Sequence, residues 1–454
     1  MEKNLTKGSV FKSIVVFSLP YFLSYLLQTL YGMADLYIIG QFEGVASTTA
    51  VSIGSQVMHM LTVMIVGLAM GATVFIGQAI GGENKKKAAS GIGNTVTLFM
   101  TVSLALTAVL VLLVRPITAV MATPADAVPG TVAYLTICFI GIPFITAYNV
   151  ISAVFRGMGD SRSPMYFIAV ACAANIGLDY LFMGVFRMGP AGAALGTTLS
   201  QAVSVAVSLV VILKKRSGIP MSKASFKPER PVMGEILKIG VPVALQDGLI
   251  QIAFIVITVI ANHRGLDDSA AVGIVEKVMS FLFLVPSSML STVSALGAQN
   301  IGAGKPERAV ATLRYAVMLA VSFGIMIAAA MQFLAEPVVA LFTDAAAADG
   351  AEVVRLGGQY LRGYVWDCIF AGVHFCFSGY FCAVGKSGIS FLHNILAIAT
   401  MRIPGVYITS GMFPDTLFPM GLATASGSLI SVVICIVAFV ILNRKDHVEL
   451  KEEP

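Results

Sequence analysis

The sequence GQAIGGENKKKA, residues 77–88, returns 221 positions later as AQNIGAGKPERA, residues 298–309. Each copy ends a long apolar stretch and leads into a basic loop. The same spacing relates RPITAVMATP, which starts at Arg115, to EPVVALFTDA, which starts at Glu336. Recurrence of several segments at one spacing predicts a chain built from two similar halves.

Two further pairs extend this repeat along the chain. Pro20 corresponds to Pro242 at a spacing of 222, and Tyr134 to Tyr360 at a spacing of 226. The change in spacing predicts a five-residue insertion in the alanine-rich loop at 345–348.

Composition indicates that lipid is the solvent of both halves. Apolar residues make up 57% of the 454 residues and charged residues 12%, with a mean hydropathy of +0.87. Crossing a hydrocarbon layer of roughly 30 Å takes about 20 mostly apolar residues in a helix. Twelve such spans are expected, at 11–39, 46–80, 88–113, 130–156, 164–186, 190–213, 234–262, 269–302, 308–334, 352–384, 388–411 and 416–442.

Six spans in each half make the repeat parallel, because an even number returns the chain to the side where it started. The predicted fold is therefore an all-α integral membrane protein of two six-helix lobes, related by a pseudo-two-fold axis along the membrane normal. We expect lobes at 1–213 and 232–454, joined by a polar, mobile linker at 214–231. A cavity between the lobes and alternating access follow from this design.

Positive charges predict the orientation. All but seven of the 29 lysines and arginines fall on the side that holds both termini and the 214–231 linker, which predicts a cell-membrane protein with that side in the cytoplasm. The net charge of +5 thus reflects topology and excludes a nucleic-acid partner. The first span is too long for a signal peptide. All six cysteines lie inside apolar spans as expected packing residues.

The chain resembles the multidrug and toxic compound extrusion (MATE) family, in its prokaryotic form. The resemblance rests on the two repeated loop motifs, on FRGMGDSRSP at 155–164 and on the twelve spans. The resemblance covers essentially the whole chain. It implies an antiporter that exports organic compounds and draws on a proton or sodium gradient. It also implies a transporter, not an enzyme, with no cofactor and no obligate protein partner.

Polar residues inside the predicted spans identify a candidate ion site. Asn175 and Asp179 lie four residues apart and share a helix face, as do Tyr31 and Asp35. Thr197 lies at a depth similar to that of Asp179. Because intramembrane acids are costly, their convergence predicts a site for Na⁺ through oxygen ligands, or for a proton shared by two carboxylates.

The family resemblance implies the same assignment. Asp35, Asn175, Asp179 and Thr197 match its first-lobe proton or sodium site, and Pro20 matches the proline where its first helix bends. Thr198 is an equally placed hydroxyl. The alternative is that these polar groups only hold helices together.

The second half carries different acids. Asp247, Glu276 and Asp367 do not repeat the first-half site. Their role stays open between contact with substrate, contact with water, and pairing with Lys277 or Arg402. Tyr31, Glu276 and Asp367 are our candidates for the substrate cavity.

Acids beside aromatic and methionine side chains suit small organic cations of amphipathic shape. A flippase of lipid-linked oligosaccharides is the alternative, although such proteins tend toward fourteen spans and a cationic cavity. The string GMGD at 157–160 also fits intramembrane aspartyl proteases, but it lies at a basic helix end where a turn explains it. The substrate, the coupling ion and the oligomeric state stay open.

Overall fold

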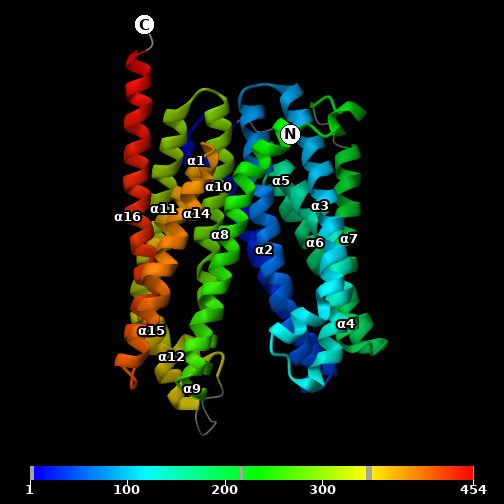
Figure 1. The fold of residues 1–454 in the computed structure, drawn as a ribbon, viewed down its shortest axis with the longest axis vertical. Coiled ribbons are helices and arrows are strands. Elements are labelled where there is room, and N and C mark those ends of the chain that lie inside the picture. The colour runs from blue at the N-terminus through cyan, green and yellow to red at the C-terminus, as the bar shows by residue number, and fades with distance from the viewer. Residues whose placement is uncertain (1–4, 215–217, 344–349, 453–454) are drawn as a thin grey trace. The chain divides into compact units, whose positions relative to one another are not determined.

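The computed structural model describes residues 5–214, 218–343 and 350–452, and the side chains up to 442. All regular elements in these ranges are helical, as Figure 1 shows. Lys215 and Arg216 of the predicted linker, and the insertion predicted at 345–348, lie outside the described residues.

The first half contains six predicted spans, and all six are present. They consist of α1 (Val10–Phe42), α2 (Val45–Gly81), α3 (Lys85–Val120), the pair α4 (Val128–Ile140) and α5 (Ile142–Gly157), α6 (Arg162–Asp179) with η2 (Tyr180–Val185), and α7 (Gly189–Lys214), with a short turn η1 (Ala125–Ala127) before α4.

The second half has the same order. Its elements are α8 (Arg230–Asn262), α9 (Leu266–Leu282) with α10 (Leu284–Gly302), α11 (Pro306–Ala340), the pair α12 (Gly350–Tyr364) and α13 (Asp367–Ala383), α14 (Ser387–Ala397) with η4 (Ile398–Arg402) and α15 (Ile403–Met412), and α16 (Phe418–Glu452). Ten helical stretches are long and apolar enough to cross a membrane, and two bent pairs complete twelve spans, which confirms the predicted fold class.

The two bent spans are the fourth of each half. The first bends by 47° between α4 and α5, and the second by 41° between α12 and α13. Gly141 separates α4 from α5, and the corresponding position in the repeat is Asp367, the first residue of α13. Pro143 follows the first break, where proline suits the opening turn of a helix. The bend in the second half therefore places an acid at a buried helix start.

Wider, π-helical turns occur in the span after the bent one in both halves, at the end of α6 in the first and between α14 and α15 in the second. The first, η2, begins directly after Asp179, and the second, η4, ends at Arg402. Such turns occur mostly as single interruptions of α-helices and often lie at functional sites. Each of them here adjoins a buried charged residue.

The repeated loop motifs pack against each other in a reciprocal way. A Cβ at Gly81 would collide with the carbonyl oxygen of Gln299, and a Cβ at Gly302 would collide with that of Gln78. The two contacts are related by the spacing of 221 residues. Only glycine permits an approach this close, which explains these two glycines.

The chain forms two compact units. The first comprises Met1–Ala244 and Ala298–Lys305, and the second Leu245–Gly297 and Pro306–Pro454. In the first unit α5 contacts α2 and α3, and α6 contacts α1 and α7. In the second unit α13 contacts α11 and α16, and α12 contacts α9. Apolar side chains fill each unit's own core.

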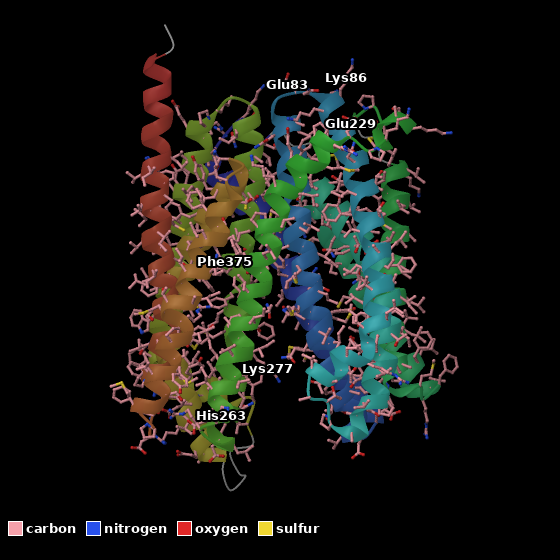
Figure 2. All side chains as sticks on the ribbon, viewed as in Figure 1. Glu83, Lys86, Glu229, His263, Lys277 and Phe375 are labelled. Atoms are coloured by element: carbon pink, nitrogen blue, oxygen red, sulfur yellow. The ribbon has the colours of Figure 1, made fainter. Side chains whose placement is uncertain are left out.

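The described part of the predicted linker packs against α3, and its mobility stays a prediction. Its single turn, η3 (Lys223–Phe226), lies on Gly93, where a Cβ would collide with the Ser225 carbonyl. Asn94 Oδ1 accepts a hydrogen bond of 2.7 Å from the backbone N–H of Glu229. Figure 2 shows Glu229 at the same end of the first unit as Glu83 and Lys86. Side chains on α3 thus supply the anchoring that composition alone did not reveal.

Candidate functional site

The four polar residues predicted to converge in the first half do so. Asp35 comes from the C-terminal part of α1, Asn175 and Asp179 from the end of α6, and Thr197 from α7. The hydroxyl of Thr197 donates a 3.1 Å hydrogen bond to Asp35 Oδ2. Asp35 is 2% exposed, and Asn175 and Asp179 are fully buried. We call Asp35, Asn175, Asp179 and Thr197 the acid pair site.

The two carboxyl groups of the acid pair site lie within interaction range of each other. Asp35 Oδ1 and both oxygens of Asp179 have no hydrogen-bond donor among the described residues. Two facing carboxylates buried without donors repel each other and lose the solvation of water. A shared proton or a bound cation removes both penalties, so the geometry fits the chemistry expected from the sequence.

The amide of Asn175 has neither a donor nor an acceptor for its own polar atoms, although it lies near Asp35. Its oxygen is therefore free to add a ligand to the site. The structure also decides between the two neighbouring threonines: Thr197 bonds to Asp35, whereas the Thr198 side chain lies against Gly141 and its hydroxyl has no partner.

Tyrosines surround the acid pair site. Tyr31, one turn before Asp35 on α1, lies near Asp35, Asp179 and Thr197. Tyr134 of α4 also lies near Asp35, and its hydroxyl is 3.0 Å from Ser55 Oγ. Tyr134 was not among the predicted site residues. The repeat offered a signal, because it pairs Tyr134 with Tyr360, which borders the buried charges of the second unit.

Gly196 is a second residue that the sequence did not identify. A Cβ on Gly196 would collide with Oδ1 of Asp179, so the carboxyl group lies directly against the backbone of α7. Gly177, on α6, has no heavy atom within 4 Å of its Cβ position.

Gly196→Ala is therefore expected to displace the Asp179 carboxyl group and to lower transport roughly tenfold, as an interaction change of about 1.4 kcal/mol does. The measurement is transport by membranes containing equal amounts of each protein. Gly177→Ala serves as the control, because it adds the same methyl group two residues before Asp179 but in open space, and it should transport normally. Equal activity of the two variants would show that the close approach is unimportant.

In the second unit the candidate acids occupy separate environments. Asp367 is fully buried, and Arg402 Nη2 donates to its Oδ2 at 2.7 Å. The same guanidinium donates to Ser428 Oγ at 2.9 Å and to the Thr424 carbonyl at 3.2 Å. Asp367 therefore pairs with Arg402, one of the two partners that the sequence left open.

Glu276 accepts a hydrogen bond from Thr258, at 3.2 Å to Oε2, and lies near Tyr360. Lys277 is exposed (Figure 2), and no ion pair joins it to Glu276 in the described part of the chain. A substrate role for Glu276, Asp367 and Tyr31 stays a prediction.

Pro20 lies inside α1, which continues through it from Val10 to Phe42. Its carbonyl accepts a 2.7 Å bond from the hydroxyl of Ser24. Proline removes one backbone hydrogen bond from the helix. The weak point predicted in α1 is present, and bending there stays a prediction.

Sequence comparison extends these findings. The chain matches the MatE family over residues 20–181 and 242–408. It is 31% identical over 404 residues to "Probable multidrug resistance protein YpnP" of Bacillus subtilis, covering 88% of each chain. The chain belongs to the MatE family. It is thus a multi-pass membrane transporter and not an enzyme, and both matched ranges include acids singled out above, Asp35 and Asp179 in the first and Glu276 and Asp367 in the second.

The chain is also similar to proteins at lower identity. The chain is 24% identical over 440 residues to "Multidrug export protein MepA" of Staphylococcus aureus, covering 96% of this chain and 95% of that one. A crystal structure described as MATE in complex with MaL6 superposes with a TM-score of 0.88 at 22% identity, covering 99% of both chains. This structural likeness establishes the fold.

Proposed function

We propose that this MatE protein exports small organic compounds, chiefly cationic amphiphiles, from the cytoplasm in exchange for protons or sodium ions. The observation that carries the proposal is the acid pair site. Two buried carboxyl groups face each other with three oxygens lacking donors, next to an amide and a hydroxyl. Burying two unpaired carboxylates is costly, and a bound cation or proton removes most of that cost by neutralising their charge.

The donor set supports both coupling ions. Carboxylate, amide and hydroxyl oxygens of Asp35, Asp179, Asn175 and Thr197 are hard ligands of the kind that alkali cations take, and the same carboxylates hold a proton between them. The ion is cargo: it enters from outside, neutralises the pair and leaves toward the cytoplasm. Coupling requires that its affinity differ between the two access states.

The names of the relatives support export. YpnP and MepA are described as multidrug resistance and multidrug export proteins, and both align with at least 88% of this chain. In the first unit, the acid pair site also lies beside the rings of Tyr31 and Tyr134, whose faces attract organic cations. We place both termini and the basic loop around Lys86 in the cytoplasm, following the distribution of positive charge.

Purified protein in liposomes tests this function directly. Liposomes loaded with a fluorescent organic cation are given an inward sodium gradient or an inward proton gradient, one at a time. We expect one gradient to drive release of the dye and its collapse to stop release. Movement of anionic lipid-linked sugars alone, with no gradient-driven dye release, would favour the flippase alternative instead.

A further inference from the structure

A second buried charge in the first unit is unrelated to the acid pair site. Arg156 lies in the last turn of α5 and is 7% exposed. Its guanidinium carbon is 4.6 Å from the centre of the Tyr21 ring, and the groups that act on its charge are Tyr21, Tyr25 and Tyr148. Among the residues that the structure describes, no carboxylate faces it. The helix C-terminus and the ring offset only part of the cost of burying this cation.

Hydroxyl groups without partners surround this arginine. Tyr148, Ser152 and Arg156 are spaced four residues apart and share one face of α5, while Tyr21 approaches from α1. The hydroxyl oxygens of Tyr21, Tyr148 and Ser152 are buried and lack a hydrogen-bond partner. Tyr148 lies near Ser152, yet neither hydroxyl completes a bond to the other. We call Tyr21, Tyr148, Ser152 and Arg156 the Arg156 cluster.

The chemistry of the Arg156 cluster selects its ligand. It offers one guanidinium and three hydroxyl groups, all able to donate, and no negative charge to compete with an anion. Buried charges in proteins are normally paired, and buried hydroxyls normally hydrogen-bonded. The three hydroxyl-bearing side chains are at most 2% exposed, which leaves no space for an organic tail. An ion with a single negative charge and a small radius meets these limits, whereas a phosphate or a drug carboxylate does not.

We propose that the Arg156 cluster binds one small monovalent anion, of which chloride is the type. The anion neutralises Arg156, accepts bonds from the hydroxyls and ties α1 to α5 inside the first unit. This site does not depend on the coupling ion, because its residues are separate from Asp35, Asn175, Asp179 and Thr197.

Equilibrium dialysis with radioactive chloride tests the site in the purified full-length protein, with sodium gluconate keeping the ionic strength constant. We expect saturable binding of about one chloride per chain, displaced by bromide and not by gluconate. Arg156→Gln should abolish this binding. Arg162→Gln is the matched control, since Arg162 is an exposed arginine six positions away, and it should bind chloride as the natural protein does.

Tyr148→Phe tests the same site if Arg156→Gln fails to fold, because it keeps the ring and removes only the hydroxyl. We expect its chloride affinity to fall about tenfold, as loss of one hydrogen bond to a charged group predicts. Chloride should also raise the unfolding temperature of the natural protein more than that of either cluster variant. Absence of saturable chloride binding, or equal binding by the natural protein and Arg156→Gln, would overturn the proposal. Water and not an anion would then bond to the hydroxyl groups of the cluster. Transport is not measured in this experiment, so its outcome is independent of the export function.

Discussion

Asp179→Asn is expected to abolish coupled export while the protein still folds and inserts into the membrane. Asparagine keeps the shape of aspartate and its capacity for hydrogen bonds, but it neither takes up a proton nor offers a negative charge to sodium. Asp179 has no hydrogen-bond donor in the acid pair site, so the exchange breaks no bond there. Gradient-driven export should fall roughly 100-fold, which corresponds to about 2.7 kcal/mol of coupling free energy.

Asp35→Asn should be nearly as severe, although the amide oxygen still accepts the bond from Thr197. The measurement compares dye export by liposomes that hold equal amounts of each protein, with and without the gradient. Asn175→Asp adds a negative charge to the same site and tests charge from the opposite direction; we expect it to change the ion dependence and not only the rate. If Asp179→Asn and Asp35→Asn still exported against a gradient with unchanged ion dependence, the acid pair would be structural.

Arg402→Met is expected to destabilise the protein by about 3–5 kcal/mol, because it leaves Asp367 buried and charged without its partner. Asp367 Oδ1 already lacks a donor, so the contact with Arg402 is the main offset to the burial of this carboxylate, with a smaller one from Ser428. The guanidinium also connects α13, η4 and α16 through Asp367, Ser428 and the Thr424 carbonyl. Its loss therefore loosens three elements at once. Unfolding in mixed micelles, followed by circular dichroism, measures the change.

Arg355→Met provides the comparison within the same unit. The pair of Arg355 with Glu352 has a similar distance, 2.6 Å, but the two side chains are 47% and 46% exposed. Its removal should cost less than about 1 kcal/mol. The double variant Asp367→Leu with Arg402→Met should recover most of the lost stability, because it replaces a buried ion pair by apolar side chains. A double variant as unstable as Arg402→Met alone would mean that the charge of Asp367 is not the cause.

Much of this molecule could be predicted from its sequence. The length of the apolar stretches predicted the twelve spans, and the recurrence of GQAIGGENKKKA related the six spans of the first half to the six of the second. Spacing by four residues and matched depth placed Asp35, Asn175 and Asp179 in one site, since helix geometry is regular enough to carry such an argument across a span. The bends inside the fourth span of each half could not be predicted, because a bent pair of helices and one straight helix have the same apolar length.

Contacts that depend on the approach of two helices could not be predicted. The closeness of Gly196 to Asp179 depends on how α7 crosses α6, and no local pattern marks that glycine among the 43 in the chain. Likewise, Arg402 and Asp367 are 35 residues apart, and the sequence alone did not show which of the three acids of the second half pairs with Arg402. The anchoring of the linker by Asn94 escaped prediction because the composition of 214–231 describes that segment and not the surface beneath it.

The π-helical turn after Asp179 has a consequence for the connection that leaves the acid pair site. A wide turn contains one residue more than the α-helical turn it replaces, and one residue corresponds to a rotation of about 100° around the helix axis. One residue gained in this segment therefore turns the chain that follows it, from Phe186 onward, by about 100° relative to α6, while Asp179 keeps its place at the end of α6. The remaining helix keeps its packing, because the extra residue is absorbed within Tyr180–Val185. The connection from α6 to α7 can in this way change its direction while Asp179 stays beside Asp35, without any change in the residues that hold the helices together.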